Sequence, residues 1–185
     1  MSLELNKNGG FIMKIVVVSY SLTGNNEALA NRIAEEFAVE HIKIKESKSR
    51  TIGSIVLDLI LKRTPLVQPT PEVLKEYDLI LFLGPIWMGQ VATPLRAYLK
   101  FLKTNPIKYA FISISGGADG TNPKLAVEFK KTVEKEPIVL IDMHIADLLP
   151  SVPKPERKDT SDYRINNEDI KKLTSAIMKI LRETI

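Results

Sequence analysis

The chain has 185 residues and a formal charge of +4, from 26 Lys and Arg against 22 Asp and Glu. This length suits one domain, and 44% hydrophobic with 26% charged residues excludes a disordered or fibrous protein. With no cysteine, disulfides, thiolate metal sites and cysteine nucleophiles are excluded, and the charge is too small to indicate a nucleic-acid partner.

The start of the chain lacks the apolar stretch of a signal peptide and precedes a second methionine, Met13. We expect a flexible leader over residues 1–12 and a single domain over residues 13–185. No apolar run reaches the roughly 18 residues that a membrane span needs. The sequence therefore predicts a soluble, cytoplasmic protein with no membrane partner.

Strands and helices alternate along the first third of the chain. Residues 14–19 hold consecutive β-branched side chains, typical of a strand buried on both faces, and a helical apolar pattern follows as far as Phe37. Residues 41–45 alternate apolar and charged side chains, which predicts an edge strand. A helix is then predicted from an apolar stripe made of Ile52, Ile55, Val56, Leu59 and Ile60.

The alternation continues to the C-terminus. In chain order we expect a buried strand at residues 79–83, a helix opened by Thr93 and Pro94, a buried strand at 109–114, a helix opened by Asn122 and Pro123, a strand at 138–141, a surface loop at 150–164 and a last helix capped by Asn166. This order predicts a doubly wound α/β fold with a parallel sheet and helices on both faces. Such sheets bind ligands at the carboxyl ends of their strands.

The loop after the first strand, residues 19–26, places hydroxyls, a glycine and two amides before a helix. Free N–H groups and the helix dipole can bind a phosphate there, Ser21 and Thr23 add donors, and Gly24 lets the backbone approach. The loop lacks the lysine of triphosphate loops and the G-x-G-x-x-G spacing of dinucleotide folds, which favours a phosphomonoester. Capping of the helix alone is the alternative.

Two further loops follow inner strands. Residues 84–90 contain the only tryptophan, Trp87, which could cover a flat conjugated ligand, with Gly89 presenting a backbone group to it; a core tryptophan is the alternative. Residues 113–120 contain three glycines, so backbone N–H groups can line a polar ring edge, although a plain turn explains them nearly as well. Together the three loops are more specific than any one alone.

The three loops resemble those of flavodoxin-like FMN-binding flavoproteins. Residues 21–26 match that family's phosphate loop, Ser/Thr-x-Thr-Gly-Asn-Thr, except at Asn26, and residues 85–89 and 115–117 look like its second and third flavin loops. The resemblance implies a three-layer, five-stranded parallel sheet of order 2-1-3-4-5 and a non-covalently bound FMN. The residues it implies for the cofactor are Ser21, Leu22, Thr23, Gly24, Asn25, Asn26, Pro85, Ile86, Trp87, Met88, Gly89, Ser115, Gly116 and Gly117.

Two features differ from the electron carriers of that family. Those carriers usually have a second aromatic ring in the third loop, where this chain has Ala118 and Asp119, and they are usually acidic. We expect electron transfer through the flavin; the alternatives are an FMN-dependent NAD(P)H oxidoreductase acting on a quinone or small acceptor, and a flavin-free interaction module. Because a flavin would supply the redox chemistry, no catalytic side chain or metal is expected. The expected partners are a redox protein or NAD(P)H, and a homodimer is an option.

Two other protein classes with a similar alternation of elements do not fit the sequence. A receiver domain needs an acidic cluster after the first strand, and a low-molecular-weight phosphatase needs a cysteine; neither is present. His41 and His144 lack metal-ligand spacing, so structural roles are expected. Residues 41–63 hold six basic residues against two acidic ones and so carry the whole net charge. This segment is expected to attract an acidic partner or a phosphorylated nicotinamide, with a solvated helix as the alternative.

Overall fold

The computed structural model describes residues 13–46, 52–61, 63–118, 120 and 122–185. Five parallel strands form one sheet in the order β2-β1-β5-β8-β9. Their bounds are Ile15–Ser19 for β1, Glu40–Lys43 for β2, Leu79–Leu83 for β5, Lys108–Ser115 for β8 and Leu140–His144 for β9. In order of appearance along the chain this is 2-1-3-4-5, so the expected strand order is confirmed.

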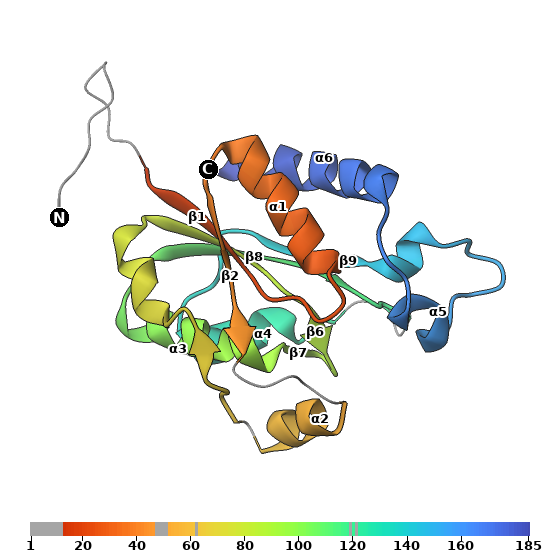
Figure 1. Ribbon diagram of the computed structural model, residues 1–185, viewed down its shortest axis with the longest axis horizontal. Helices are drawn as coiled ribbons and strands as arrows, with labels where there is room; N and C mark the ends of the chain where they lie inside the picture. Colours follow the sequence, from red (N-terminus) through yellow and green to blue (C-terminus); the bar gives the residue numbers. More distant parts are fainter. Residues whose placement is uncertain (1–12, 47–51, 62, 119, 121) are drawn as a thin grey trace.

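Helices cover both faces of the sheet (Figure 1). On one face lie α1 (Asn25–Phe37) and α6 (Asn167–Thr184), and on the other lie α3 (Arg96–Thr104) and α4 (Leu125–Val133). Two further helices, α2 (Ile52–Ile60) and the short α5 (Arg157–Ser161), lie outside these layers. The doubly wound α/β fold predicted from the alternation of elements is therefore confirmed.

The two hydrophobic cores follow from the alternation of side chains along the strands. In β1, Val17 faces the α1 and α6 layer, whereas Val16 and Val18 face the α3 and α4 layer, and all three are fully buried. Because both faces of a parallel sheet are covered, the inner strands are apolar at consecutive positions. Burial on both faces therefore explains the run of β-branched residues from which this strand was predicted.

Short elements complete the fold around the sheet. Two small antiparallel pairs join β3 (Lys45–Glu46) to β4 (Val67–Gln68) and β6 (Ile86–Trp87) to β7 (Gln90–Val91). Three 3-10 turns occupy Pro71–Glu76, Thr93–Leu95 and Ile145–Leu148. No helix among the described residues is both long and apolar enough to cross a membrane.

Several element boundaries differ from the sequence predictions. The fifth strand begins at Leu140 rather than at residue 138, and Thr93 begins a 3-10 turn before α3 instead of capping that helix. The expected surface loop at 150–164 contains α5. Ile60 is exposed although it was assigned to the apolar face of α2, because that short helix buries only part of its apolar surface. By contrast, Asn166 caps α6 as expected, through bonds from the N–H groups of Glu168 and Asp169.

Candidate functional site

The three candidate loops follow β1, β5 and β8, which lie side by side in the sheet. Contacts link the three loops. The Tyr20 and Trp87 rings join the first and second loops edge to face at 5.7 Å, the Asn26 side chain makes two hydrogen bonds to the backbone of Ile114 in the third, and Asn122, just after the third loop, donates from Nδ2 to Gly89 O at 2.6 Å. Loops far apart in sequence therefore form one surface at the carboxyl edge of the sheet.

The first loop ends in a left-handed glycine and an open helix start. Gly24 has φ +91° and directly precedes α1, while its own N–H donates to Ser21 Oγ at 3.0 Å. None of the described residues accepts a hydrogen bond from the backbone N–H of Thr23, Asn25 or Asn26. These donors and the positive end of the α1 dipole suit an anion.

The side chains of Asn25 and Asn26 have other partners. Asn26 Nδ2 donates to Ile114 O at 2.9 Å and Asn26 Oδ1 accepts from Ile114 N at 3.0 Å. Asn25 pairs in the same way with Tyr163 O and Ile165 N, at 3.0 and 3.2 Å. Both side chains are almost fully buried, so these residues offer a ligand their backbone N–H groups rather than their side chains.

The second loop folds as a tight hairpin. Strands β6 and β7 pair Ile86 with Val91 and Trp87 with Gln90, which leaves Met88 and Gly89 as the two turn residues. Both have positive φ, +49° and +78°, as a type I′ turn requires. Trp87 is half-buried with one edge against Tyr20, whereas the Met88 side chain at the tip is 72% exposed.

Three polar side chains from outside the hairpin form hydrogen bonds to its turn and to its second strand. Gly89 O accepts from Asn122, the Gln90 side chain accepts from Arg96 Nη2 at 2.7 Å, and Val91 N donates to both carboxyl oxygens of Glu128 at 3.0 and 3.2 Å. Burial lowers the pKa of the Arg96 guanidinium and raises the pKa of the Glu128 carboxyl.

Sequence reasoning missed these three side chains as parts of the site. Arg96 and Glu128 lie on α3 and α4, and no pattern in the sequence connects those helices to the hairpin. From the sequence, Asn122 is predicted only to open a helix together with Pro123. Their role becomes visible only when the helices dock on the sheet.

In the third loop, two glycines are required by contacts with the protein itself. Gly117 has φ +71°, and a Cβ there would lie 2.2 Å from the Cβ of His144. A Cβ on Gly116 would lie 2.9 Å from Thr160 Oγ1. Close packing therefore accounts for these glycines, although within the described residues their backbone N–H groups have no acceptor.

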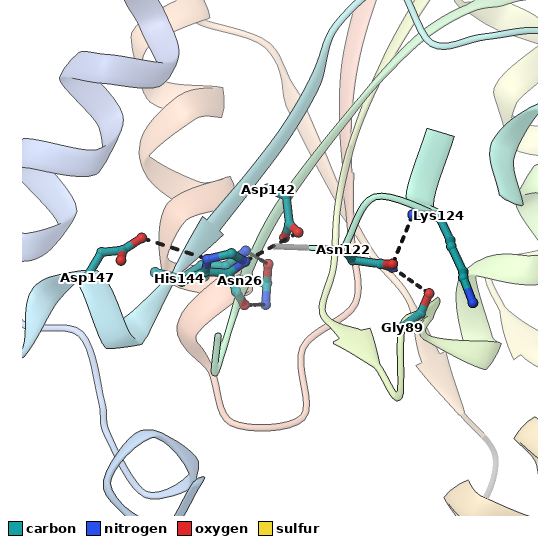
Figure 2. Close-up of polar contacts among 8 residues, drawn as sticks. Asn26, Gly89, Asn122, Lys124, Asp142, His144 and Asp147 are labelled. Carbon is teal, nitrogen blue, oxygen red and sulfur yellow. Dashed lines mark hydrogen bonds and ion pairs between the residues drawn. The ribbon is translucent and has the colours of Figure 1, made fainter. Parts of the chain in front are cut away.

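Beneath the third loop lies a small polar cluster (Figure 2). His144 is buried, with Nε2 3.3 Å from Asp142 Oδ2 and Nδ1 3.7 Å from Asp147 Oδ2. Asp142 Oδ1 and Ser113 Oγ are buried and have no hydrogen-bond partner in the described part of the chain. His144 therefore lies buried between two carboxylates, and its structural role stays a prediction.

His41 also has a structural environment. Its Nε2 lies 2.7 Å from Ser19 Oγ and its Nδ1 lies 2.8 Å from Asn31 Oδ1, so the ring links β2 to β1 and α1. Burial, with a smaller contribution from Lys43, lowers the pKa of His41. Among the described residues, no group of three or more His, Cys, Asp or Glu side chains could hold a metal ion.

The basic segment over residues 41–63 lies only partly within the described residues. Lys48, Arg50 and Lys62 fall outside them. Lys43 Nζ forms an exposed ion pair with Glu27 Oε1 at 2.7 Å. The predicted attraction of an acidic or phosphorylated partner therefore stays a prediction.

We compared the chain with family models, curated proteins and solved structures, and only the solved structures gave matches. No protein-family model matches the chain, and no curated protein matches it significantly. Among solved structures, a flavoprotein from Lactobacillus acidophilus NCFM in complex with FMN matches with a TM-score of 0.58 and 25% identity, over 71% of this chain and 93% of that chain. The apo form of the flavoprotein from that organism matches with a TM-score of 0.54 and 23% identity, over 75% and 97%.

A third structure extends the likeness. A candidate flavoprotein from Bacteroides eggerthii matches with a TM-score of 0.61 and 16% identity, over 81% of this chain and 94% of that chain. The sheet order and these matches define the class of protein as flavodoxin-like α/β. The resemblance to flavodoxin-like flavoproteins that the loops predicted is confirmed.

Proposed function

We propose that this chain binds FMN without a covalent bond and transfers electrons through the flavin. The observation that carries the proposal is the joining of the three loops at one sheet edge, where the α1 start offers backbone donors without acceptors among the described residues. The FMN complex of the Lactobacillus acidophilus flavoprotein, which shares this fold, supports the choice of ligand.

In this proposal the first loop holds the phosphate. The backbone N–H groups of Thr23, Asn25 and Asn26 donate to its oxygens, and Ser21 and Thr23 add hydroxyl donors. Charged phosphate at a helix start is favoured by both the free N–H groups and the dipole. Leu22 and Gly24 shape the loop around it.

The second and third loops hold the ring system. Residues 85–89 supply Trp87 for stacking, and residues 115–117 supply backbone N–H groups for the polar edge. A bound flavin would accept and release electrons, while the chain supplies binding, orientation and exclusion of water. No side-chain acid or base is assigned a catalytic role.

A titration with FMN tests this assignment. We expect Ser21→Asp to weaken FMN binding at least about tenfold, because it places a carboxylate beside the phosphate. Ser175→Asp adds the same charge on the exposed side of α6 and is expected to leave the affinity unchanged. An unchanged affinity in Ser21→Asp would mean that the phosphate binds elsewhere. If the wild-type protein takes up no FMN, the proposal is wrong and the flavin-free interaction module is the remaining hypothesis.

The second candidate is an FMN-dependent NAD(P)H oxidoreductase. Ala118 stands where electron carriers usually have a ring, and the Met88 side chain at the hairpin tip is mostly exposed, so an open flavin face is favoured. Anaerobic mixing with NADH or NADPH separates the two. Transfer of a hydride to the flavin, leaving NAD(P)⁺, bleaches the flavin within seconds; a carrier fed by a partner protein shows no bleaching.

Partners and location stay proposals. If the basic segment attracts an acidic partner or a phosphorylated nicotinamide, neutralising Lys48 and Arg50 slows reduction at low salt and the difference shrinks as salt is added. A homodimer is the other proposed association, and the cytoplasmic location remains a prediction from the sequence. An equal reduction rate in the variant at low salt would reject the role of the basic segment.

A further inference from the structure

The tip of the β6–β7 hairpin is held by a residue that follows the third loop. Asn122 lies just before α4, and its Oδ1 accepts from Lys124 N at 3.1 Å. Its Nδ2 donates to Gly89 O at 2.6 Å, so one side chain spans the start of α4 and the turn of the hairpin (Figure 2).

This hairpin depends on contacts outside itself. It has only two residues in each strand, and two-stranded hairpins are marginal in water. Its turn also places Met88, a residue with a β-carbon, at φ +49°, which is an unfavourable conformation for such residues. Packing of Ile86, Trp87 and Val91 against the core and hydrogen bonds from outside the hairpin therefore both stabilise it, and the hydrogen bond to Gly89 O acts on its turn.

Of the three side chains that hold the hairpin, Asn122 has a distinct place. Arg96 and Glu128 hold Gln90 and Val91 from within α3 and α4. Asn122 alone of these three reaches the turn, and it comes from the segment that connects the third loop to α4. The Asn122 side chain therefore links the turn of the hairpin directly to the segment that follows the third loop.

We propose that Asn122 is a positioning residue that couples the second and third loops and sets the place of Trp87 before a ligand binds. The inference rests on the proposed flavin site and deepens it. Asn122 is expected to affect the ring part of the ligand, because it fixes the hairpin and makes no hydrogen bond to the first loop among the described residues. A hairpin that is already formed avoids the cost of ordering it on binding.

Two variants separate this role from simple capping of α4. Asn122→Ala removes both hydrogen bonds. Asn122→Asp keeps an oxygen acceptor for Lys124 N but loses the donor to Gly89 O, and Asp is a good residue at a helix start. A capping role therefore predicts that Asn122→Asp resembles the wild type, whereas the coupling role predicts that it resembles Asn122→Ala.

The first measurement uses Trp87, the only tryptophan, as a reporter in the flavin-free protein. We expect acrylamide to quench its fluorescence more strongly in both variants, with an unfolding midpoint in urea close to that of the wild type. Wild-type quenching in Asn122→Asp would overturn the coupling role. This measurement decides the effect on the hairpin even if the protein binds no flavin.

The second measurement compares FMN with riboflavin, which lacks the phosphate. We expect both variants to bind each ligand about fivefold to tenfold more weakly, the value of one hydrogen bond. Ser21→Asp, by contrast, is expected to weaken FMN but not riboflavin. Equal riboflavin affinity in the wild type and both variants would overturn the inference and leave the proposed function standing, whereas a wild type that binds neither ligand contradicts the proposed function itself.

Discussion

The side chain of Asn26 pairs with the backbone of Ile114 as a neighbouring strand would, donating to its carbonyl and accepting from its N–H at 2.9 and 3.0 Å. The bonds tie the first turn of α1 to the carboxyl end of β8, across 88 residues of sequence. Buried backbone groups that leave a sheet ladder need such partners. Asn26 therefore holds two loops of the candidate site in register.

Asn26→Ala should lower the free energy of unfolding by about 2 to 4 kcal/mol, because it leaves two buried backbone groups of Ile114 without partners. Urea unfolding measures this. Asn167→Ala is the matched control: Asn167 is exposed on the first turn of α6 and should change stability by less than about 0.5 kcal/mol. Equal effects of the two changes would contradict the structural role of Asn26.

Gly117→Ala should destabilise the protein by about 2 to 4 kcal/mol, since it combines a left-handed backbone with a clash against His144. Gly120→Ala isolates the backbone part: Gly120 has φ +89° with open space around it and should cost about 1 kcal/mol. Thermal unfolding of both, and of Gly117→Ala in a His144→Gly background, gives the steric part, because only glycine removes the His144 Cβ that lies 2.2 Å from the added one. If Gly117→Ala costs as much in the His144→Gly background as in the wild type, the clash is not its cause.

His41 should make stability depend on pH. Its pKa is lowered in the folded protein, so the folded state takes up the proton less readily than the unfolded chain, whose ordinary value is 6.5. The stability that the folded protein gains from keeping His41 neutral is therefore present above pH 6.5, and it is lost as the pH falls from there toward the lowered pKa. Urea unfolding at pH 7.5 and 5.5 should show a smaller difference for His41→Gln than for the wild type, and an equal difference would reject the role.

Arg96→Lys should lower stability by about 2 kcal/mol. The Arg96 guanidinium donates to the carbonyls of Asp58 and Arg63, both at 3.4 Å, as well as to Gln90, and one ammonium cannot reproduce that planar set of donors. Gln90→Ala removes a single partner and should cost less, about 1 kcal/mol. Denaturant titrations of both variants compare them, and a larger loss in Gln90→Ala would contradict this assignment.

From the sequence, the three loops of the candidate site could be predicted, and the structure brings them to one edge of the sheet; their role in binding FMN stays a prediction. The sequence indicates the phosphate loop through the hydroxyls and glycine of residues 21–26, and the second loop through its tryptophan. Both indications come from residues that are adjacent in the chain. The partners of Asn25 and Asn26 were not, since they lie 88 to 140 residues away. For the same reason, the sequence offers only a ligand or a plain turn as the cause of glycine at 117, whereas the structure adds the close contact with His144.

The sequence by itself determined the alternation of strands and helices, the doubly wound class and the apolar inner strands, because side-chain periodicity reflects which faces are covered. Only the tertiary structure decided that Asn122, Arg96 and Glu128 form hydrogen bonds to the hairpin. It also decided that Gly117 has no room for a side chain. Those contacts form when the helices dock on the sheet. Because they join residues that are far apart in the chain, they produce no periodic pattern in the sequence.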